Sequence, residues 1–202
     1  MVRNPLPFDH KKATQLLNYF ASKSGGRINK MKALKLIFLA DRYHLRKYGR
    51  LISNDFYVAM KLGPVPSVVL DIAESDSFLT QEYKNYASNY IRPLDGGRQI
   101  ESVGEIDNSY FSESDLEALA FSWDNFGQYK KWSLSDFTHN YPEWKNHEQA
   151  IRAGSKCENM ELADFFDDPS VGINKCFDLN EEEKAIRKDQ LSEQIHLESI
   201  WR

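Results

Sequence analysis

The run LKLIFLADRYHLRKYGRL, residues 34–51, constrains the fold of this chain more than any other stretch. It predicts a helix that begins at Asn29 or Lys30 and ends at Tyr48, because Gly49 is a natural C-cap. At about 100° per residue its apolar side chains form one broad face and a second strip. The broad face comprises Met31, Leu34, Ile37, Phe38, Leu45 and Tyr48, and the strip comprises Leu36, Ala40 and Tyr43. A helix that is apolar on two sides has to be covered on two sides, so we expect a multi-helix domain around a central buried helix at about 30–48.

Asp41 lies on the broad apolar face of this helix, where a carboxylate is costly to bury without a partner. The chain after the helix is expected to fold back over its C-terminal half as a hairpin. We therefore expect Asp41 to bond to Lys61, Arg50 or Tyr57, or to backbone amides near Gly63. On this hypothesis the aspartate fixes the register of helix and hairpin as part of a structural clasp. The clasp residues are Asp41, Tyr48, Gly49, Gly63 and Pro64.

A narrow basic strip is all that this helix is expected to leave for water. It consists of Lys32, Lys35, Arg42 and Arg46, with Leu39 among them and no acidic residue. The strip has three interpretations: a plain solvated face, a contact for an acidic protein partner, or a contact for nucleic acid. A pI near 5.8 and the absence of a helix-turn-helix pattern or a basic-aromatic ribbon make nucleic acid the weakest of the three. We keep these four cations as candidate partner-binding residues.

The rest of the chain is predicted to be mostly helical with a small antiparallel hairpin or sheet, a mostly α (α+β) fold. A helix is expected over 8–23, with Asp9 as its N-cap. Further helices are expected from Pro66 to about Glu74, over 77–86, from Ser112 or Ser114 to Gly127, and from Ser133 with Asp136 in a capping box. A Ser53-Asn54-Asp55 turn is expected to divide a short apolar piece from a strand over 56–60, as a small hairpin. Two more strands are expected around the Gly96-Gly97 turn, over 90–94 and 99–103. The segment Gly63-Pro64-Val65-Pro66 is expected to turn the chain.

The tail after residue 158 is acidic and is predicted to hold two helices, a short one at ELADFF and a charged one over 181–199 that opens with Asn180 and Glu183 as a capping box. The longer helix has apolar residues on two sides: Ile186, Leu197, Ile200 and Trp201 on one, and Leu191 and Ile195 on the other. Either it is wedged into its own domain, which we favour, or it offers one face to another chain. We thus expect one domain over 1–157 and, over 158–202, an acidic helical extension packed on or near it.

The chain has a net charge of −4, but the charged residues are distributed unevenly along it. Residues 1–62 hold 13 Lys or Arg against three Asp, whereas residues 63–157 and 158–202 each carry a net charge of −7. Such polarity arises from a basic surface aimed at an anionic partner or from oppositely charged segments packed on each other. We slightly favour the internal packing.

Two Asp-His pairs have the spacing of neighbours on a helix face: Asp41 with His44, and Asp136 with His139. An acid–base enzyme could use such pairs, but no nucleophile elbow, metalloprotease, P-loop or dinucleotide motif accompanies them. We therefore favour a structural role for each of these aspartates and histidines. Cys157 and Cys176 have no metal-ligand spacing, and we expect no cofactor and no metal.

No apolar run approaches the roughly 20 residues that span a bilayer, and the first residues, MVRNPLPFDHKK, lack an export signal. We expect a cytoplasmic protein with no membrane contact.

Two stretches resemble the Panacea domain, the SocA-like antitoxin domain of phage-associated proteins. Residues 29–72, NKMKALKLIFLADRYHLRKYGRLISNDFYVAMKLGPVPSVVLDI, resemble its central helix, Tyr-Gly turn, strand ending in Ala-Met, and Gly-Pro-Val segment. Residues 133–146, SLSDFTHNYPEWKN, resemble its closing helix, with Ser133, Thr138, His139 and Trp144 in the matching places. Together the stretches bracket residues 8 to about 150.

The resemblance implies an antitoxin that neutralises a cognate toxin by direct protein contact, the toxin being encoded by an adjacent gene. One relative is thought to deliver its toxin to a protease, so a proteolytic-adaptor role is also implied. The alternatives are a small enzyme of unknown reaction using Asp41, His44 or His139, and a DNA-binding autoregulator.

Overall fold

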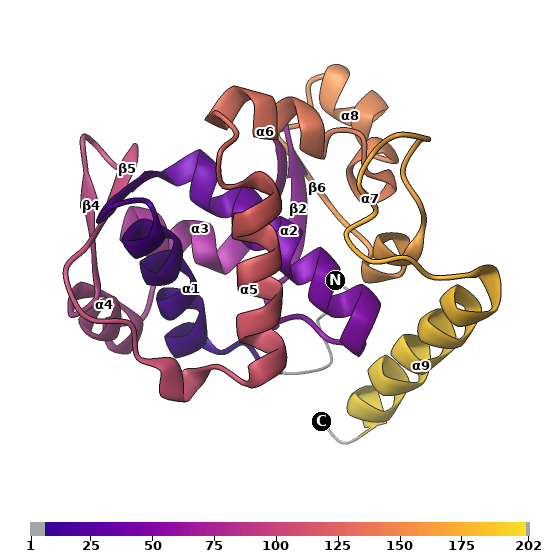
Figure 1. Cartoon of the computed structure of the whole chain (residues 1–202), viewed down its shortest axis with the longest axis horizontal. Coiled ribbons are helices and arrows are strands. Elements are labelled where there is room, and N and C mark those ends of the chain that lie inside the picture. Colours follow the sequence, from indigo (N-terminus) through magenta and orange to yellow (C-terminus); the bar gives the residue numbers. More distant parts are fainter. Residues whose placement is uncertain (1–6, 201–202) are drawn as a thin grey trace.

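The central helix runs through the middle of the molecule, with other helices around it (Figure 1). The computed structural model describes residues 7–200, and it is mostly helical with two small antiparallel sheets, which confirms the predicted fold class. Helix α2 (Lys30–Tyr48) packs against α5 (Glu113–Phe126) and α1 (His10–Lys23). Every residue from Ala33 to Arg46 is buried. The helix is therefore covered on all sides over this stretch, more completely than its two apolar faces predict.

The ends of α1 and α2 follow the capping residues read from the sequence. The Asp9 side chain accepts from the backbone nitrogens of Lys11 and Lys12, at 3.1 and 2.9 Å, and starts α1. Gly49, with φ of 78°, ends α2 and donates its N–H to the Leu45 carbonyl at 2.8 Å. Both caps satisfy backbone groups that a helix end leaves without partners.

One sheet packs against α2. Strand β2 (Tyr57–Met60) pairs with β3 (Gly63–Pro66) on one side and with β6 (Cys157–Asn159) on the other, both antiparallel. The strand predicted over 56–60 is confirmed, but the turn of its hairpin is at Lys61 and Leu62 instead of Ser53-Asn54-Asp55. The expectation that residues 63–66 only turn the chain is also wrong. They form the second strand, and its two prolines are tolerated because β3 is at the sheet edge and needs no donor on its outer side.

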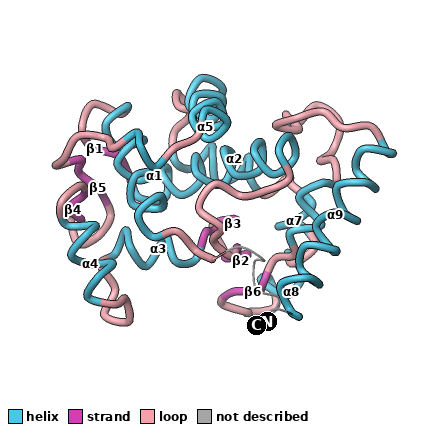
Figure 2. Tube along the Cα trace, turned by 90° about the horizontal axis from the view of Figure 1, so that it is seen from below, coloured by secondary structure: helices cyan, strands magenta, loops and turns pink. Residues whose placement is uncertain are grey.

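The other sheet is at one end of the molecule, at the left of Figure 2. Strands β4 (Ile91–Leu94) and β5 (Gln99–Ser102) form the predicted hairpin, and β1 (Arg27–Asn29) pairs with β5. The sequence pattern missed β1 because three residues are too few to show a period.

Short helices connect these parts. They are α3 (Ser67–Glu74), α4 (Gln81–Ser88), the 3₁₀ helix η1 (Asn108–Tyr110), α6 (Lys131–Thr138), α7 (Pro142–Lys145) and α8 (Glu148–Arg152). Helix α5 has a full capping box between Ser112 and Asp115. The capping box expected at Ser133 is wrong, since α6 begins at Lys131 and has no side-chain cap.

Residues after 157 contribute to the core. The 3₁₀ helix η2 (Leu162–Phe166) places Phe165 against Phe38 and Tyr57, with ring centroids 5.6 and 5.3 Å apart. Helix α9 (Glu181–Ile200) begins with the predicted capping box, in which Asn180 and Glu183 exchange hydrogen bonds of 2.8 and 2.9 Å.

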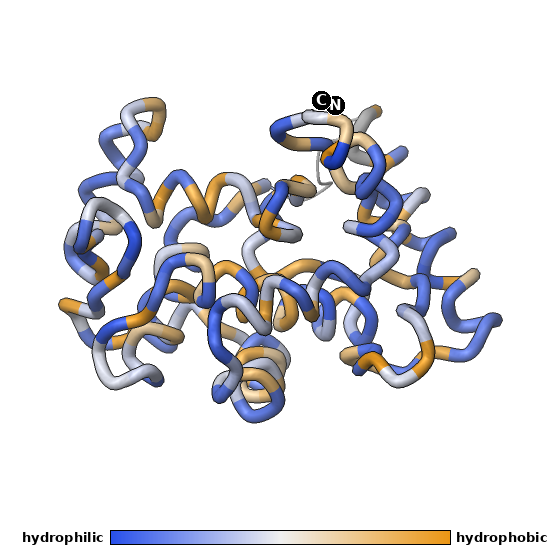
Figure 3. The backbone as a smooth tube through the Cα atoms, turned by 90° about the horizontal axis from the view of Figure 1, so that it is seen from above, coloured by the Kyte–Doolittle hydropathy of each residue, from blue (hydrophilic) through white to orange (hydrophobic). Residues whose placement is uncertain are grey.

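Helix α9 lies along the outside of the molecule, and its trace is largely hydrophilic (Figure 3). Leu191 is 5% exposed and faces the domain, whereas Ile186, Leu197 and Ile200 are 49, 48 and 62% exposed. The preferred expectation of a helix wedged between two neighbours is therefore wrong within the described residues. Only one apolar row finds a partner; Trp201, assigned to the other row, lies outside the described residues.

Candidate functional site

Asp41 is fully buried and joins α2 to the chain that follows it. Its Oδ1 accepts from the Ile52 backbone nitrogen at 2.7 Å, and its Oδ2 accepts from the Tyr57 hydroxyl at 2.7 Å. Burial raises the pKa of Asp41 to about 6, and the two hydrogen bonds act in the opposite direction. Of the partners expected from the sequence, the structure provides Tyr57, and the amide is that of Ile52 instead of one near Gly63.

Asp55 is a second buried carboxylate, predicted from the sequence only as part of a turn. It accepts from the backbone nitrogens of Phe56, Val68 and Val69, at 2.8, 3.1 and 2.8 Å. Two of these donors are in the first turn of α3, where a carboxylate also meets the positive end of the helix dipole. Burial raises the pKa of Asp55 to about 7.

Gly63 and Pro64 are positioned by a buried lysine. Gly63 has φ of 101°, and a Cβ there would lie 2.8 Å from Thr138 Oγ1 and 3.0 Å from Lys35 Nζ. Lys35 Nζ donates to the Pro64 carbonyl at 2.6 Å, and burial lowers the pKa of this lysine to about 7. Only glycine fits this turn, because both the backbone angle and the space exclude a side chain.

Tyr48, in contrast, is not part of a buried clasp. Its side chain is 37% exposed, and its hydroxyl donates to Glu117 Oε2 at 2.5 Å. The expectation that Tyr48 lies on the buried face is wrong, because the last turn of α2 extends beyond the elements that cover the rest of the helix.

Arg42 is completely buried and holds two segments that are far away in the sequence. One guanidinium nitrogen pairs with Glu143, which is also completely buried, and the other donates to the Asp167 carbonyl at 2.7 Å. The guanidinium also lies over the Tyr141 ring, 4.4 Å from its centroid. Burial alone would lower the pKa of Arg42, but the charge and hydrogen bond of Glu143, together with Cys176 and Tyr141, more than offset this and raise it.

Arg46, one turn further, binds the chain after η2. It donates to the carbonyls of Phe177 at 2.7 Å and Phe166 at 2.7 Å, and pairs with Asp168 Oδ1 at 2.8 Å. This fork of donors satisfies carbonyl groups of an irregular segment that would otherwise be buried without partners.

The exposed basic strip predicted for α2 is therefore wrong for Lys35, Arg42 and Arg46. Each is at most 1% exposed, because β3, α7 and the segment over 162–177 cover this side of the helix and supply its acceptors. Lys32 alone is half-buried; it donates to the Gly127 carbonyl at 2.5 Å, and burial lowers its pKa. Three of the four candidate partner-binding cations are thus unavailable to a partner at the surface.

The uneven charge of the chain is largely matched inside the molecule. Among the described residues, seven cations within the first 62 positions form ion pairs with acids of the later segments. The pairs are Lys12 and Arg50 with Asp115, Arg27 with Glu101, Lys30 with Glu74, Arg42 with Glu143, Arg46 with Asp168, and Lys47 with Glu117. Of the two interpretations of the charge polarity, the structure shows oppositely charged segments packed on each other.

His44 is buried and hydrogen-bonded on both ring nitrogens. Nδ1 lies 2.8 Å from the Arg50 carbonyl, so it carries the proton, and Nε2 accepts from the Ser114 hydroxyl at 3.0 Å. Burial lowers the pKa of His44 to about 4. Neither Asp41 nor His44 therefore faces a space in which a substrate could reach it.

His139 lies elsewhere, stacked on Trp144 with ring centroids 3.8 Å apart. Burial lowers the pKa of His139, and its Nε2 has no hydrogen-bond partner among the described residues. No contact within residues 7–200 joins it to Asp41 or His44. The Asp-His pairs read from the sequence are thus not assembled into one acid–base site.

His139 and Trp144 form one wall of a surface pocket of about 790 Å³ between α6, α8 and the ends of β2 and β6, which we name the α8 pocket. Met60, Trp144 and Ile151 give it apolar walls, and Trp144 is fixed by a hydrogen bond of 2.9 Å from Nε1 to the Met60 carbonyl. Lys61, Arg152 and Lys156 stand around it. Only Lys61 was named from the sequence, as a possible partner of Asp41; Arg152 and Lys156 were not, because these cations come from separate parts of the chain and show no period.

Metal and thiol chemistry find little support in the described residues. Within residues 7–200 no group of three or more His, Cys, Asp or Glu side chains is placed to hold a metal ion. Cys157 and Cys176 are free thiols, and burial raises the pKa of Cys176 to about 11. Over the same residues, no helix combines the length and hydropathy needed to cross a membrane.

Comparison with known proteins gives one match. The family model described as antitoxin SocA-like, Panacea domain, matches residues 34–145, from the start of the buried part of α2 to the end of α7. No curated protein and no solved structure matches the chain. The matched range includes Arg42 and Glu143 but excludes the segment that binds Arg46.

Proposed function

Because the chain belongs to the SocA-like antitoxin family, whose Panacea domain spans residues 34–145, we propose that it is the antitoxin of a toxin–antitoxin pair. It neutralises a cognate toxin by direct protein contact in the cytoplasm, and the toxin is encoded by an adjacent gene. The family match is the observation that carries this proposal, since it covers more than half of the chain, including most of the central helix.

The geometry of the ionisable side chains favours binding over catalysis. A general base needs a substrate within hydrogen-bond reach, and a nucleophile needs an activating neighbour in an accessible space. Asp41 and His44 are fully buried and spend their hydrogen bonds on the backbone and on Tyr57 and Ser114. Their role is to hold α2 to the segments around it.

A DNA-binding autoregulator is supported less well. That alternative rested on a basic strip along α2, and three of its four cations are buried. Phosphate contacts require cations that reach the surface.

Growth assays test the proposal. Expression of the neighbouring gene alone is expected to arrest growth, and co-expression of this chain is expected to restore it, with the two products purifying as one complex. A neighbour that is harmless when expressed alone contradicts the proposal.

The same cells distinguish occlusion from degradation. If the chain is a proteolytic adaptor, its co-expression shortens the half-life of the toxin, and removal of the host protease restores toxicity. If it acts by occlusion, the toxin accumulates in the complex and its half-life does not fall.

A further inference from the structure

The α8 pocket has the features of a recognition site. None of these features takes part in the internal contacts of α2 described above. Its volume of about 790 Å³ is in the range of ligand pockets, and its walls are mostly apolar. One wall is rigid, because Trp144 is held by its hydrogen bond to Met60 and by the stacked ring of His139.

The charges around this pocket are mainly positive. Lys61 and Lys156 are exposed, and within residues 7–200 neither ammonium group has a hydrogen bond or an ion pair. Arg152 is paired with Glu148 at 2.6 Å. Of the other acids on the neighbouring elements, Asp136 is exposed, Glu158 is half-buried, and Glu143 is buried and paired with Arg42. Most of the described cations within the first 62 positions have an ion pair or a side-chain hydrogen bond, and Lys61, like Lys11 and Lys23, has neither.

Exposed apolar side chains continue beyond the rim. Leu62 is 43% exposed and Trp132 is 56% exposed. Trp132, Ser135 and His139 share one face of α6, and Ser135 donates to the Leu62 carbonyl at 3.0 Å, which places the β2–β3 turn over that face. Lys131 lies over the Trp132 ring, 5.3 Å from its centroid. An apolar surface with cations at its edge extends further than a small molecule would need.

We propose that the α8 pocket and the adjoining Leu62–Trp132 surface bind an acidic segment of a partner protein. An aromatic or aliphatic side chain of that segment fills the pocket between Met60, Trp144 and Ile151, and carboxylates beside it pair with Lys61 and Lys156. Charge complementarity selects the occupant, because two unpaired ammonium groups flank an apolar hollow. The identification of this partner with the toxin rests on the proposed function.

A peptide that does not involve the toxin tests the site. The probe is a fluorescein-labelled peptide with one tryptophan flanked by aspartates and glutamates, titrated with the full chain and followed by anisotropy. We expect binding, at least tenfold weaker in Lys61→Glu/Lys156→Glu and weaker in Ile151→Ser. The matched control is Lys23→Glu/Arg98→Glu, two exposed cations at the other end of the molecule. Circular dichroism verifies that each variant is folded.

Several outcomes overturn the site. They are equal binding by the charge-reversed variant and the control variant, equal binding of a peptide with asparagine and glutamine in place of its acids, and preferential binding of a fluorescent single-stranded oligonucleotide.

Two measurements with the neighbouring gene product, its binding to the chain and the rescue of growth, separate the two proposals. If Lys61→Glu/Lys156→Glu binds and neutralises that product like the wild type, the site inference fails and the antitoxin proposal stands. If the product never binds while the acidic peptide does, the reverse holds.

Discussion

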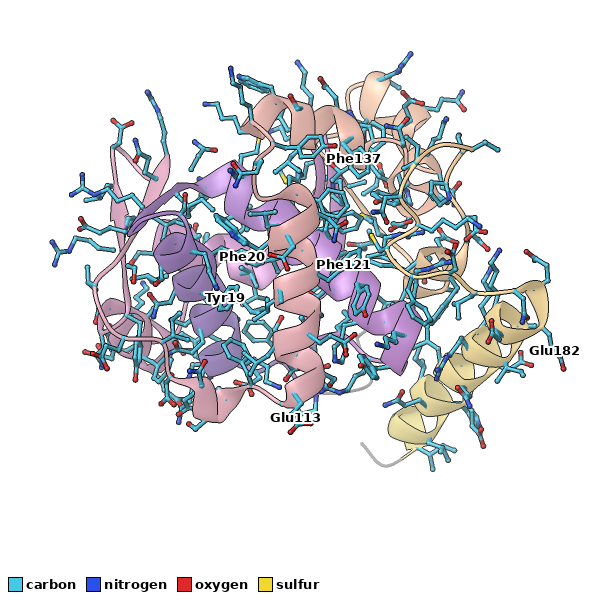
Figure 4. All side chains as sticks on the ribbon, viewed as in Figure 1. Tyr19, Phe20, Glu113, Phe121, Phe137 and Glu182 are labelled. Carbon is cyan, nitrogen blue, oxygen red and sulfur yellow. The ribbon has the colours of Figure 1, made fainter. Side chains whose placement is uncertain are left out.

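Helices α2 and α9 have nearly the same length and opposite surroundings. Helix α2 carries Lys35, Arg42 and Arg46 into the interior, whereas α9 leaves Ile186 and Leu197 half exposed. Figure 4 shows the contrast: the labelled aromatic rings gather around α2 and α5, while Glu182 extends from the outer side of α9 into solvent. Residue type alone does not decide which side chains are buried.

Acceptors explain the difference. The cations of α2 meet carbonyl and carboxylate oxygens of segments that have no regular structure to satisfy them, so burial of the charge is compensated by several hydrogen bonds. Helix α9 meets the domain along one row only, through Leu191 and through Arg187, which donates to the Lys47 carbonyl at 2.9 Å. Cations are therefore buried in this protein where hydrogen-bond acceptors meet them. The comparison predicts which substitutions lower the free energy of unfolding most.

Breaking the Arg42–Glu143 pair should have the largest effect. Arg42→Met leaves a fully buried carboxylate without its cation, and we expect the free energy of unfolding to fall by about 3–5 kcal/mol in urea titrations. The double variant Arg42→Met/Glu143→Met should recover most of this loss, because it removes both charges.

The matched control is Arg92→Met, whose side chain is 64% exposed beside Glu101. We expect it to change the free energy of unfolding by less than about 0.5 kcal/mol. An equal effect of the two single variants would mean that the buried pair contributes no more than a surface pair.

Asp41 provides a test that depends on pH. Its pKa is raised by burial from 3.8 to about 6, so the folded state binds the proton more tightly than the unfolded state. This contribution to stability is fully present below pH 3.8 and is lost as the pH rises through about 6. The stability deficit of Asp41→Asn relative to the wild type should therefore shrink by up to about 3 kcal/mol between pH 4 and pH 8.

Urea titrations at several pH values measure this trend, with the exposed Asp95→Asn as the control. A deficit that grows with pH would show that the hydrogen bonds to Ile52 and Tyr57 outweigh burial, and that the pKa of Asp41 is lowered instead.

The sequence predicted those parts of the fold that depend on near neighbours. The bounds of α1 and α2, the caps at Asp9 and Gly49, and the β4–β5 hairpin follow from local patterns of period and turn residues. Burial of Asp41 was also inferred locally, from its place on an apolar face.

Burial of the arginines could not be predicted in this way. The acceptors of Arg42 and Arg46 lie 101 to 131 positions further along the chain. A helical wheel shows that these cations share a strip, but it does not show that carbonyls from η2 and the loop after it will cover the strip. The α8 pocket was missed for the same reason, since Lys61 and Lys156 meet only through the pairing of β2 with β6.

The two apolar rows of α9 give a comparison within one helix. Leu191→Ala removes packing from the buried row, and we expect a loss of about 2 kcal/mol, seen as faster amide hydrogen exchange in α9. Leu197→Ala acts on the exposed row and should change stability by less than about 0.5 kcal/mol. Similar losses in both variants would show that a second neighbour covers the outer row in solution.

The smallest effect is expected for the exposed ion pair between Lys188 of α9 and Asp167, which can be compared with the buried pair that Arg46 of α2 makes with the next aspartate. Lys188 pairs with Asp167 at 2.6 Å, and both side chains are more than a third exposed, whereas Arg46 pairs with Asp168 from a fully buried position. Lys188→Met should therefore cost less than about 1 kcal/mol, and the loss should fade at high salt because exposed charges are screened. Arg46→Met should cost several times more at any salt concentration, since it also leaves the carbonyls of Phe166 and Phe177 without donors. Urea titrations at low and high salt measure both, and a salt-dependent Arg46 loss would mean that water reaches the interior of α2.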